Sequence, residues 1–233
     1  MNYPNFSEEK KLWRKGYEFV IGLDEAGRGP LAGPVVAAGV IVSQFQISNF
    51  KFQINDSKKL NARKREETYD LLTNHPNIQY GVGVVSEKII DQINILEATK
   101  LAMQKAISNL SYKSHGREIC KTVDFLLIDG NFSIQIAQSL PSANIIRMRP
   151  SEFENIPYKS IVKGDQKVFS ISAASIIAKV TRDRIMKQMH ETYPKYGFNQ
   201  HKGYATRMHV ENLKNFGPCK IHRKTFFLVS VYK

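Results

Sequence analysis

Asp24-Glu25-Ala26-Gly27-Arg28-Gly29 closes an apolar run, Tyr17 to Leu23, that is rich in β-branched and aromatic residues. Such a run predicts a buried strand over 17–23. Glycine tolerates backbone angles that other residues avoid, so the Gly-Arg-Gly turn can approach a ligand closely. Two carboxylates beside a phosphate would repel it unless cations lie between them. The stretch therefore indicates metal-assisted phosphate chemistry; the alternative is a turn that ends the strand with two solvated acids.

The composition is that of a basic globular protein. The chain has 233 residues, with 34 Lys and Arg against 21 Asp and Glu and a formal net charge of +13. This length suffices for one sizeable core and a small appended domain. An excess of positive charge attracts polyanions and gives binding that weakens with salt. We therefore expect a nucleic-acid partner, the alternative being a basic surface that serves solubility.

The cysteines and the N-terminus bear on the compartment. Cys120 and Cys219 are the two cysteines, far apart and in no Cys-x-x-Cys pattern, which argues against a disulfide framework or a zinc site. The N-terminal residues contain no apolar signal region, and no run approaches the ~18 apolar residues of a membrane span. We expect a cytoplasmic protein that makes no membrane contact.

Strands and helices alternate along the chain without repeats. A second strand over 35–42 follows the Gly33-Pro34 break and is expected to form a hairpin with the first. Further strands are predicted at 78–85, 125–128 and 143–148, and helices at 62–72, 87–93, 96–110 and 169–189. This order predicts an α/β fold with a mixed sheet. After Pro194 the composition shifts to Gly, His, Lys and aromatic residues, which indicates a small helical C-terminal unit.

Two acidic residues follow apolar runs at the carboxyl ends of predicted strands. Asp24 and Asp129 hold these positions, where open α/β sheets place their ligand sites. If the two strands are adjacent and parallel, the carboxylates come close, and divalent metal would relieve their repulsion. Glu25 faces the opposite side from Asp24 in a regular strand. Both acids reach one site only if the strand is already turning, which Gly27 makes plausible.

A third acid, Asp183, lies on the predicted helix 169–189. It falls on a face whose earlier turns are small and apolar, so it can point inward at the edge of the sheet. The alternative is an exposed acid paired with Arg182 or Arg184, and the residues alone favour that alternative.

Six motifs occur in order along the chain. They are Asp24-Glu-Ala-Gly-Arg-Gly-Pro30, Asp56-Ser-Lys-Lys-Leu60, Leu127-Ile-Asp-Gly130, Ala173-Ala-Ser-Ile-Ile-Ala-Lys-Val-Thr-Arg-Asp183, His201-Lys-Gly-Tyr204 and His222-Arg-Lys-Thr-Phe226. Together they resemble bacterial ribonuclease HII, a type 2 ribonuclease H, from about Tyr17 to Phe227. The resemblance implies a ribonuclease H-like mixed five-stranded sheet flanked by helices. Residues 1–193 would form the catalytic domain and residues 194–233 a small helical C-terminal region that contributes to substrate binding.

The resemblance also implies an activity. The family cleaves the RNA strand of RNA–DNA hybrids and nicks duplex DNA on the 5′ side of embedded ribonucleotides, leaving 3′-hydroxyl and 5′-phosphate ends, and so removes misincorporated ribonucleotides. Its four metal-binding acids match Asp24, Glu25, Asp129 and Asp183. Two Mg²⁺ or Mn²⁺ ions would flank the scissile phosphate, and carboxylate oxygens suit these hard cations. We expect a monomer.

Two further groups of residues are expected to bind the substrate. The resemblance assigns recognition of the ribose 2′-hydroxyl to Gly27, Arg28 and Gly29, together with Tyr204. The alternatives are a core tyrosine at 204 and a salt bridge from Arg28 to Asp24 or Glu25, which is compatible with substrate contact.

The segment 56–59 precedes a predicted helix and admits two compatible interpretations. Lys58 and Lys59, with Ser57, can hold a phosphate at the positive end of the helix. Asp56 or Ser57 can equally cap the helix. The basic segments 163–165 and 222–224 are candidates for contact with the nucleic-acid backbone, against the alternative of a solvated surface.

Two alternatives to ribonuclease HII compete. Ribonuclease HIII carries Gly-Lys-Gly in the matching turn and an additional N-terminal domain, so Arg28 and the 23 residues before Asp24 argue against it. A non-enzymatic nucleic-acid-binding protein would explain the charge but not the acids at motif positions. Metal-dependent nicking of a duplex with one ribonucleotide separates these alternatives.

Overall fold

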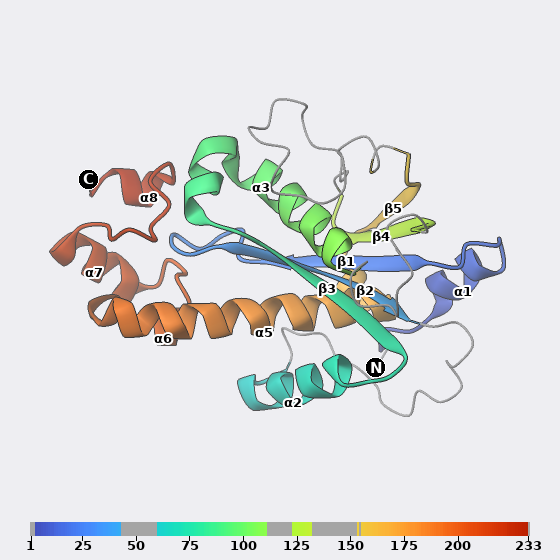
Figure 1. The fold of residues 1–233 in the computed structure, drawn as a ribbon. Coiled ribbons are helices and arrows are strands. Elements are labelled where there is room, and N and C mark those ends of the chain that lie inside the picture. The colour runs from blue at the N-terminus through green and yellow to red at the C-terminus, as the bar shows by residue number, and fades with distance from the viewer. Residues whose placement is uncertain (1–2, 43–59, 111–122, 132–152, 154, 233) are drawn as a thin grey trace.

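The computed structural model describes residues 3–42, 60–110, 123–131, 153 and 155–232. At its centre is a five-stranded sheet with the strand order β3-β2-β1-β4-β5 (Figure 1). The strands are β1 Val20–Ala26, β2 Val35–Val42, β3 Ile78–Val85, β4 Phe125–Asp129 and β5 Tyr158–Ile161. The expected mixed five-stranded α/β sheet is confirmed.

The pairing explains why the sheet is mixed. β2 pairs antiparallel with both β1 and β3, whereas β1, β4 and β5 run parallel. The predicted hairpin 17–42 is therefore present, and β2 and β3 have the predicted bounds. Parallel β1, β4 and β5 bring three carboxyl ends to one edge of the sheet, where ligand sites form.

The strand β5 was missed by the sequence analysis. Its residues, Tyr-Lys-Ser-Ile, are exposed or half-buried at the edge of the sheet, so they lack the apolar run of a central strand. The strand predicted at 143–148 lies outside the described residues. Ser57, Lys58 and Lys59 also lie outside them.

The first strand is shifted along the chain relative to its prediction. β1 runs over Val20–Ala26 rather than 17–23, so both acids lie inside it and not after it. Pairing with β2 continues as far as Ala26, whereas the amide groups of Glu18 and Phe19 bind the carboxylate of Asp124 instead of a neighbouring strand. Hydrophobicity marked the strand, but the hydrogen-bond ladder determines where it starts and ends.

Helices cover both faces of the sheet (Figure 1). α3 (Glu87–Leu110) packs on one face, and α5 (Phe169–Thr192) packs on the other with α2 (Ala62–Thr73) beside it. The break predicted between two helices is confirmed within α3, because Asn94 has a non-helical backbone with φ 67°. Its side-chain oxygen accepts the amide hydrogens of Leu96 and Glu97 and so caps the second half.

The C-terminal region is built of short helical segments, as expected. These are η5 Pro194–Tyr196, α6 Phe198–His201, α7 Arg207–Phe216 and α8 Phe227–Ser230. They lie at the end of the molecule where α5 finishes, opposite α1 (Ser7–Trp13) (Figure 1). Tyr196, Phe198 and Ile221 pack against Ala32 and Met186, so this region is joined to the sheet by its own small apolar core.

Buried histidines form a hydrogen-bonded network in this region. His209 Nδ1 lies 2.8 Å from the Tyr204 carbonyl, which only accepts, so Nδ1 carries the proton and Nε2 is an acceptor. His222 Nε2, 3.0 Å away, therefore donates to His209 Nε2. The Nδ1 of His222 accepts the amide hydrogen of Cys219 at 2.9 Å. Both rings are thus held in the neutral form.

His201 is held in the same way. Its Nε2 lies 2.7 Å from the Tyr196 carbonyl and so donates, and its Nδ1 accepts the amide hydrogen of Gly203 at 3.1 Å. The ring stacks on His209 with centroids 4.4 Å apart. A second proton on His201 Nδ1 would face the Gly203 amide, and one on His209 Nε2 would face the N–H group of His222.

This network predicts acid sensitivity of the fold. Burial lowers the pKa of both His209 and His222 to about 4, below the value of about 6.5 expected in the unfolded chain. Between these values the unfolded state binds more protons, so the free energy of unfolding is highest above pH ~6.5 and falls as the pH drops towards 4. The slope is about 1.4 kcal/mol per pH unit for each histidine.

Urea denaturation between pH 7.5 and 5 measures that slope. His209→Gln is expected to flatten it, whereas His75→Gln, outside the network, should leave it unchanged. Equal slopes for the wild type and His209→Gln would contradict the prediction. The buried acids Asp24 and Glu9 have raised pKa values, so they make the free energy of unfolding rise as the pH falls. This contribution is the same in the wild type and the variants, and it cancels when their slopes are compared.

Candidate active site

Asp24 and Asp129 lie side by side at the carboxyl edge of the sheet. β1 and β4 are adjacent and parallel, and Leu23 is in register with Ile128. The next residues of the two strands, Asp24 and Asp129, therefore lie next to each other. Asp24 faces α5, on the opposite side of the strand from Leu23, which packs towards α3. The two acids that the sequence placed at strand ends are therefore brought together.

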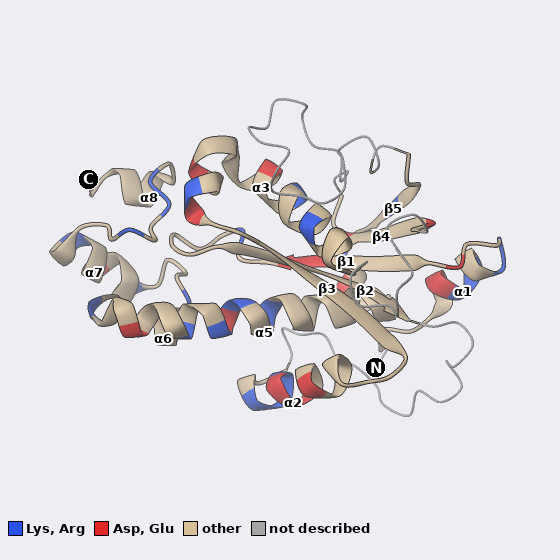
Figure 2. Cartoon of the chain, viewed as in Figure 1, with Lys and Arg blue, Asp and Glu red and all other residues tan. Residues whose placement is uncertain are grey.

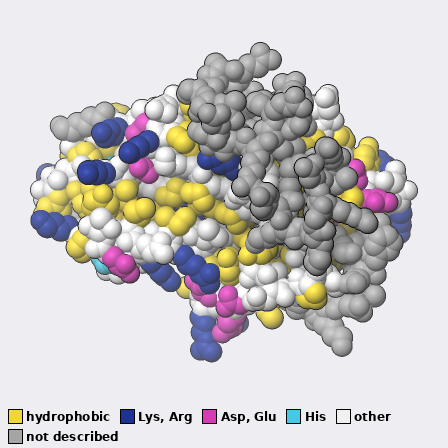
Figure 3. Space-filling view, in the orientation of Figure 1, with side chains coloured by type: hydrophobic (Ala, Val, Ile, Leu, Met, Phe, Trp, Pro, Cys, Tyr) yellow, Lys and Arg dark blue, Asp and Glu magenta, His cyan; other side chains and the backbone are white. Residues whose placement is uncertain are grey.

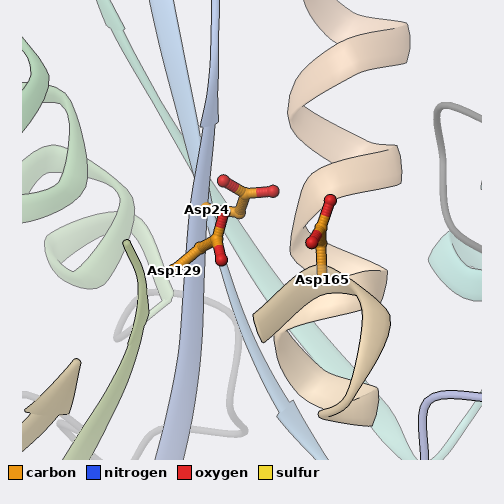
Figure 4. A group of neighbouring side chains, drawn as sticks. All are labelled: Asp24, Asp129 and Asp165. Atoms are coloured by element: carbon orange, nitrogen blue, oxygen red, sulfur yellow. The ribbon is translucent and has the colours of Figure 1, made fainter. Parts of the chain in front are cut away.

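A third carboxylate, Asp165, joins them from another element. Asp165 lies in η4 (Gly164–Gln166), the turn between β5 and α5, and its side chain is buried. Carboxylate oxygens of Asp24, Asp129 and Asp165 all lie within 4.8 Å of one another (Figure 4). The amide of Gly164 donates to Asp129 Oδ1 at 2.6 Å, which links the turn directly to β4.

Asp165 is not among the site residues predicted from the sequence, because the lysine beside it gives the segment a basic character. The segment 163–165 was noted as a possible backbone contact for its lysine. The position of Asp165 just after a strand could have indicated its role. Because β5 runs parallel to β4, an acid shortly after β5 reaches the same edge of the sheet as Asp129. The strand could not be recognised in the sequence, because β5 is half polar.

Asp183, the fourth metal-binding acid that the resemblance implies, lies apart from this cluster of carboxylates. Among the described residues, the group of converging carboxylates contains Asp165 and not Asp183. The carboxylate of Asp183 accepts a hydrogen bond from Lys179 Nζ at 2.8 Å, one helical turn earlier, and lies 4.0 Å from Arg65. Its side chain is 15% exposed, and the paired cations are not the predicted Arg182 or Arg184. Asp183 is thus paired with cations of α5 and α2 and stands outside the converging carboxylates.

The environment of Asp24 disfavours its charged form. Burial raises the pKa of Asp24 well above its ordinary value, and the nearby carboxylates of Glu25 and Asp129 raise it further. Hydrogen bonds from the Ser175 hydroxyl and from the Glu25 amide, at 2.7 Å, act in the opposite direction. A divalent cation between these carboxylates would remove the repulsion, so the buried acids suit a metal ion.

Both neighbouring acids of β1 line one pocket. This pocket has a volume of about 280 Å³, and its walls include Asp24, Glu25 and Asp129. Glu25 is outside the three closest carboxylates but remains at the pocket, where Arg28 Nη1 donates to it at 3.3 Å. The salt bridge considered for Arg28 is thus present, and Arg28 also lines the pocket.

The glycine turn forms another wall of the pocket. Gly27 has φ +101°, and a Cβ atom there would lie 2.1 Å from Arg182 Nε. Glycine is therefore required at this position by the fold itself. At Gly29, by contrast, an added Cβ would meet no atom within 4 Å.

Positively charged and aromatic side chains complete the pocket. Arg65 and Lys179 line it together with Tyr204. The Tyr204 ring lies 5.6 Å from Lys179 Nζ and is 42% exposed, so Tyr204 is not a core residue. Neither Arg65 nor Lys179 is predicted as a site residue from the sequence, because their positions depend on how α2 and α5 pack together.

Charge is distributed unevenly around this site. Figure 2 shows acidic residues interrupting β1 within the sheet and basic residues along the second half of α5 and in the C-terminal region. In Figure 3, lysine and arginine side chains gather at the end of the molecule that carries the C-terminal helices and along the lower edge near α2. An acidic site surrounded by basic residues suits the binding of a polyanion through metal ions.

The donor set fits a hard divalent cation. Carboxylate oxygens are the ligands that Mg²⁺ and Mn²⁺ prefer, and the three converging side chains supply only such oxygens. Metal that binds the folded state alone stabilises it by about 2.7 kcal/mol at 100 times its Kd. We therefore expect saturating Mn²⁺ or Mg²⁺ to raise the thermal midpoint by roughly 5–10 °C.

Thermal unfolding followed by circular dichroism, with added metal or with EDTA, tests this expectation. Asp129→Asn is the matched control and should show little metal-dependent shift. An identical midpoint with and without millimolar metal in the wild type would contradict a metal site at these acids.

Comparison with known proteins matches the chain to one family. The family model described as Ribonuclease HII matches residues 21–229. The ribonuclease HII of Chlamydia caviae is 47% identical over 218 residues, covering 94% of this chain and 88% of the relative. That of Acholeplasma laidlawii is 46% identical over 226 residues, covering 97% and 96%.

A solved structure agrees with this match. The crystal structure of ribonuclease H2 from Pyrococcus horikoshii superimposes with a TM-score of 0.65 at 26% identity, covering 91% of this chain and 96% of that one. Within the described ranges, no helix is both long and apolar enough to cross a membrane.

Proposed function

This chain belongs to the ribonuclease HII family, and from that premise we propose that Asp24, Glu25, Asp129 and Asp165 form its catalytic site. The protein is a metal-dependent endoribonuclease that cleaves the RNA strand of RNA–DNA hybrids and nicks duplex DNA on the 5′ side of embedded ribonucleotides. The observation that carries the site is the convergence of three buried or half-buried carboxylates within 4.8 Å.

The metal proposed here is a pair of Mg²⁺ or Mn²⁺ ions. When bound, such ions neutralise the scissile phosphate, activate the attacking water and stabilise the departing 3′ oxygen. Asp24, Asp129 and Asp165 would hold them, with Glu25 at the edge of the set. The hydrogen bonds from Ser175 to Asp24 and from the Gly164 amide to Asp129 orient the carboxylates before metal arrives.

Three cations at the pocket are proposed to hold the substrate backbone. Arg28, Arg65 and Lys179 line the pocket beside the acids, where they attract the phosphates that flank the cleaved bond. Asp183 holds Lys179 and Arg65 in place through its two carboxylate oxygens. Ser57, Lys58 and Lys59 remain proposed phosphate contacts, because the two lysines are cationic and the serine hydroxyl can donate a hydrogen bond.

Recognition of ribose is proposed for the turn 27–29 and Tyr204. The 2′-hydroxyl is the group that distinguishes RNA from DNA, so the site must contact it. A turn of Gly-Arg-Gly exposes backbone groups without bulk, and the exposed Tyr204 ring offers a flat surface for a neighbouring sugar.

The remaining proposals concern organisation. Residues 1–193 would form the catalytic domain, and residues 194–233 would contribute to substrate binding, as Tyr204 at the pocket supports. A monomer is the proposed oligomeric state. A cytoplasmic location is proposed with it.

The activity is tested with a DNA duplex that contains one ribonucleotide. In Mg²⁺ or Mn²⁺ the protein should cut 5′ to that ribonucleotide, leaving a 3′-hydroxyl, and it should leave an all-DNA duplex of the same sequence intact. EDTA should stop the reaction. Binding without cutting in either metal would favour a non-enzymatic nucleic-acid-binding protein.

The two turn glycines give a sharper test of the ribose site. Gly29→Ala should fold with unchanged or slightly higher stability, since the methyl group meets no atom of the protein. Its cleavage at a single ribonucleotide should nevertheless fall by about tenfold or more, because the methyl group would stand where the sugar approaches. Thermal unfolding and initial rates measure the two effects separately.

Gly27→Ala is the contrasting variant. It should lose stability as well as activity, because of its positive φ and the clash with Arg182. Full activity of Gly29→Ala would remove residue 29 from the substrate site.

A further inference from the structure

Two arginines are fully buried behind the glycine turn. Arg182 and Arg223 have no exposed side-chain surface, and each donates three hydrogen bonds to backbone carbonyls. Arg223 belongs to the basic segment 222–224, for which the sequence predicts contact with the nucleic-acid backbone. For the Arg223 side chain that interpretation is wrong, because the guanidinium is inside the protein and does not line the pocket.

The guanidinium of Arg223 binds the turn itself. Its Nη2 donates to the Gly27 carbonyl at 2.6 Å and its Nη1 to the Arg28 carbonyl at 2.9 Å. Its Nε donates to the Gly33 carbonyl at 3.0 Å, where the loop returns to β2. These three bonds use the planar fork of arginine, whose geometry no other side chain reproduces.

These contacts decide which way the peptide groups of the turn face. In a trans peptide the carbonyl of one residue and the amide hydrogen of the next point in opposite directions. Carbonyls of Gly27 and Arg28 that point inward to Arg223 therefore turn the amide hydrogens of Arg28 and Gly29 away from it. The turn 27–29 lines the pocket, whereas Arg223 does not. Successive amide hydrogens of this kind form an anion- or oxygen-binding concavity.

Arg223 is in turn held by its surroundings. Its own amide donates to the Leu31 carbonyl at 2.9 Å. Asp91 of α3 accepts hydrogen bonds from the amides of Lys224 and Thr225, which follow it. Burial, with Arg182 nearby, lowers the pKa of Arg223 to about 9, so the side chain stays charged at neutral pH. The guanidinium is thus a fixed, charged support beneath the turn.

We propose that Arg223 is a positioning residue for ribose recognition, which fixes the Gly27 and Arg28 carbonyls so that the amide hydrogens of Arg28 and Gly29 face the 2′-hydroxyl. This inference rests on the proposed function, because it takes the turn 27–29 as the reader of that hydroxyl. Through Arg223 the C-terminal region thereby affects the selectivity for ribose over deoxyribose, although this residue does not contact the substrate.

The test compares two substrates within one preparation of each variant. Arg223→Lys keeps the charge but cannot hold three carbonyls, and Arg223→Gln provides a neutral second variant that still donates. The substrates are a duplex with one ribonucleotide and a continuous RNA–DNA hybrid, each giving a kcat/KM. The ratio of the two values does not depend on the folded fraction. Arg207→Lys, on the exposed face of α7, is the matched control.

We expect the ratio of single-ribonucleotide to hybrid cleavage to fall by about tenfold or more in both Arg223 variants and to stay unchanged in Arg207→Lys. A hybrid offers many ribose contacts and registers, so it tolerates a loosened turn better. A ratio equal to that of the wild type, whatever the loss of stability, would overturn the proposal and leave Arg223 a purely structural link. Failure of the wild type to cleave either substrate would instead refute the proposed function.

Discussion

Replacement of Asp129 by asparagine is expected to lower cleavage by roughly 10⁴-fold while the fold stays intact. Asparagine has the same shape and can still accept the hydrogen bond that the Gly164 amide makes to Oδ1. What it removes is one of three converging negative charges, and with it the attraction for divalent metal. Initial rates in saturating Mg²⁺ and Mn²⁺ on a single-ribonucleotide duplex measure the loss.

The same variant has a second signature, in the absence of metal. The carboxylate of Asp129 raises the pKa of Asp24 by repulsion, so its neutralisation should leave the metal-free protein at least as stable as the wild type. A combined Asp24→Asn and Asp129→Asn variant should lose little more activity than either alone, because the acids act as one unit. Near-normal turnover with an unchanged circular dichroism spectrum would refute the assignment of this site.

The second large effect distinguishes Asp165 from Asp183 as the metal ligand. Asp165→Asn should raise the metal concentration needed for half-maximal cleavage by about 100-fold, since Asp165 belongs to the converging carboxylates. Asp183→Asn should leave that concentration nearly unchanged, because its carboxylate binds Lys179 and Arg65 instead. Its expected defect is weaker substrate binding through misplaced cations.

Metal titrations of cleavage, run on both variants and the wild type, make the comparison. The two changes are chemically identical, so any difference reflects position alone. A larger shift in the metal midpoint for Asp183→Asn than for Asp165→Asn would restore Asp183 as a ligand, as the family motifs imply. The thermal shift with Mn²⁺ gives an independent reading of the same difference.

Local patterns in the sequence were sufficient for most of the secondary structure. β2 and β3 have the predicted bounds, because β-branched runs bounded by turn residues leave little choice of conformation. The break in α3 was also predictable, since it occurs at a single asparagine between two apolar-periodic segments. β5 was not, because an edge strand is stabilised by pairing with β4 rather than by its own hydrophobicity.

The sequence alone determined the membership of the family, through six motifs in order, and the α/β class, through the alternation of apolar strands and helices. It also marked Asp24 and Asp129 as acids at strand ends, but the parallel pairing of β1 with β4 is what brings them together. Only the tertiary structure decided between Asp165 and Asp183 and revealed that Arg223 lies beneath the turn. Those outcomes depend on contacts such as that between Arg223 and Gly27, which are 196 residues apart. Burial, pKa shifts and the direction of a peptide group arise from such distant partners, and no local pattern encodes them.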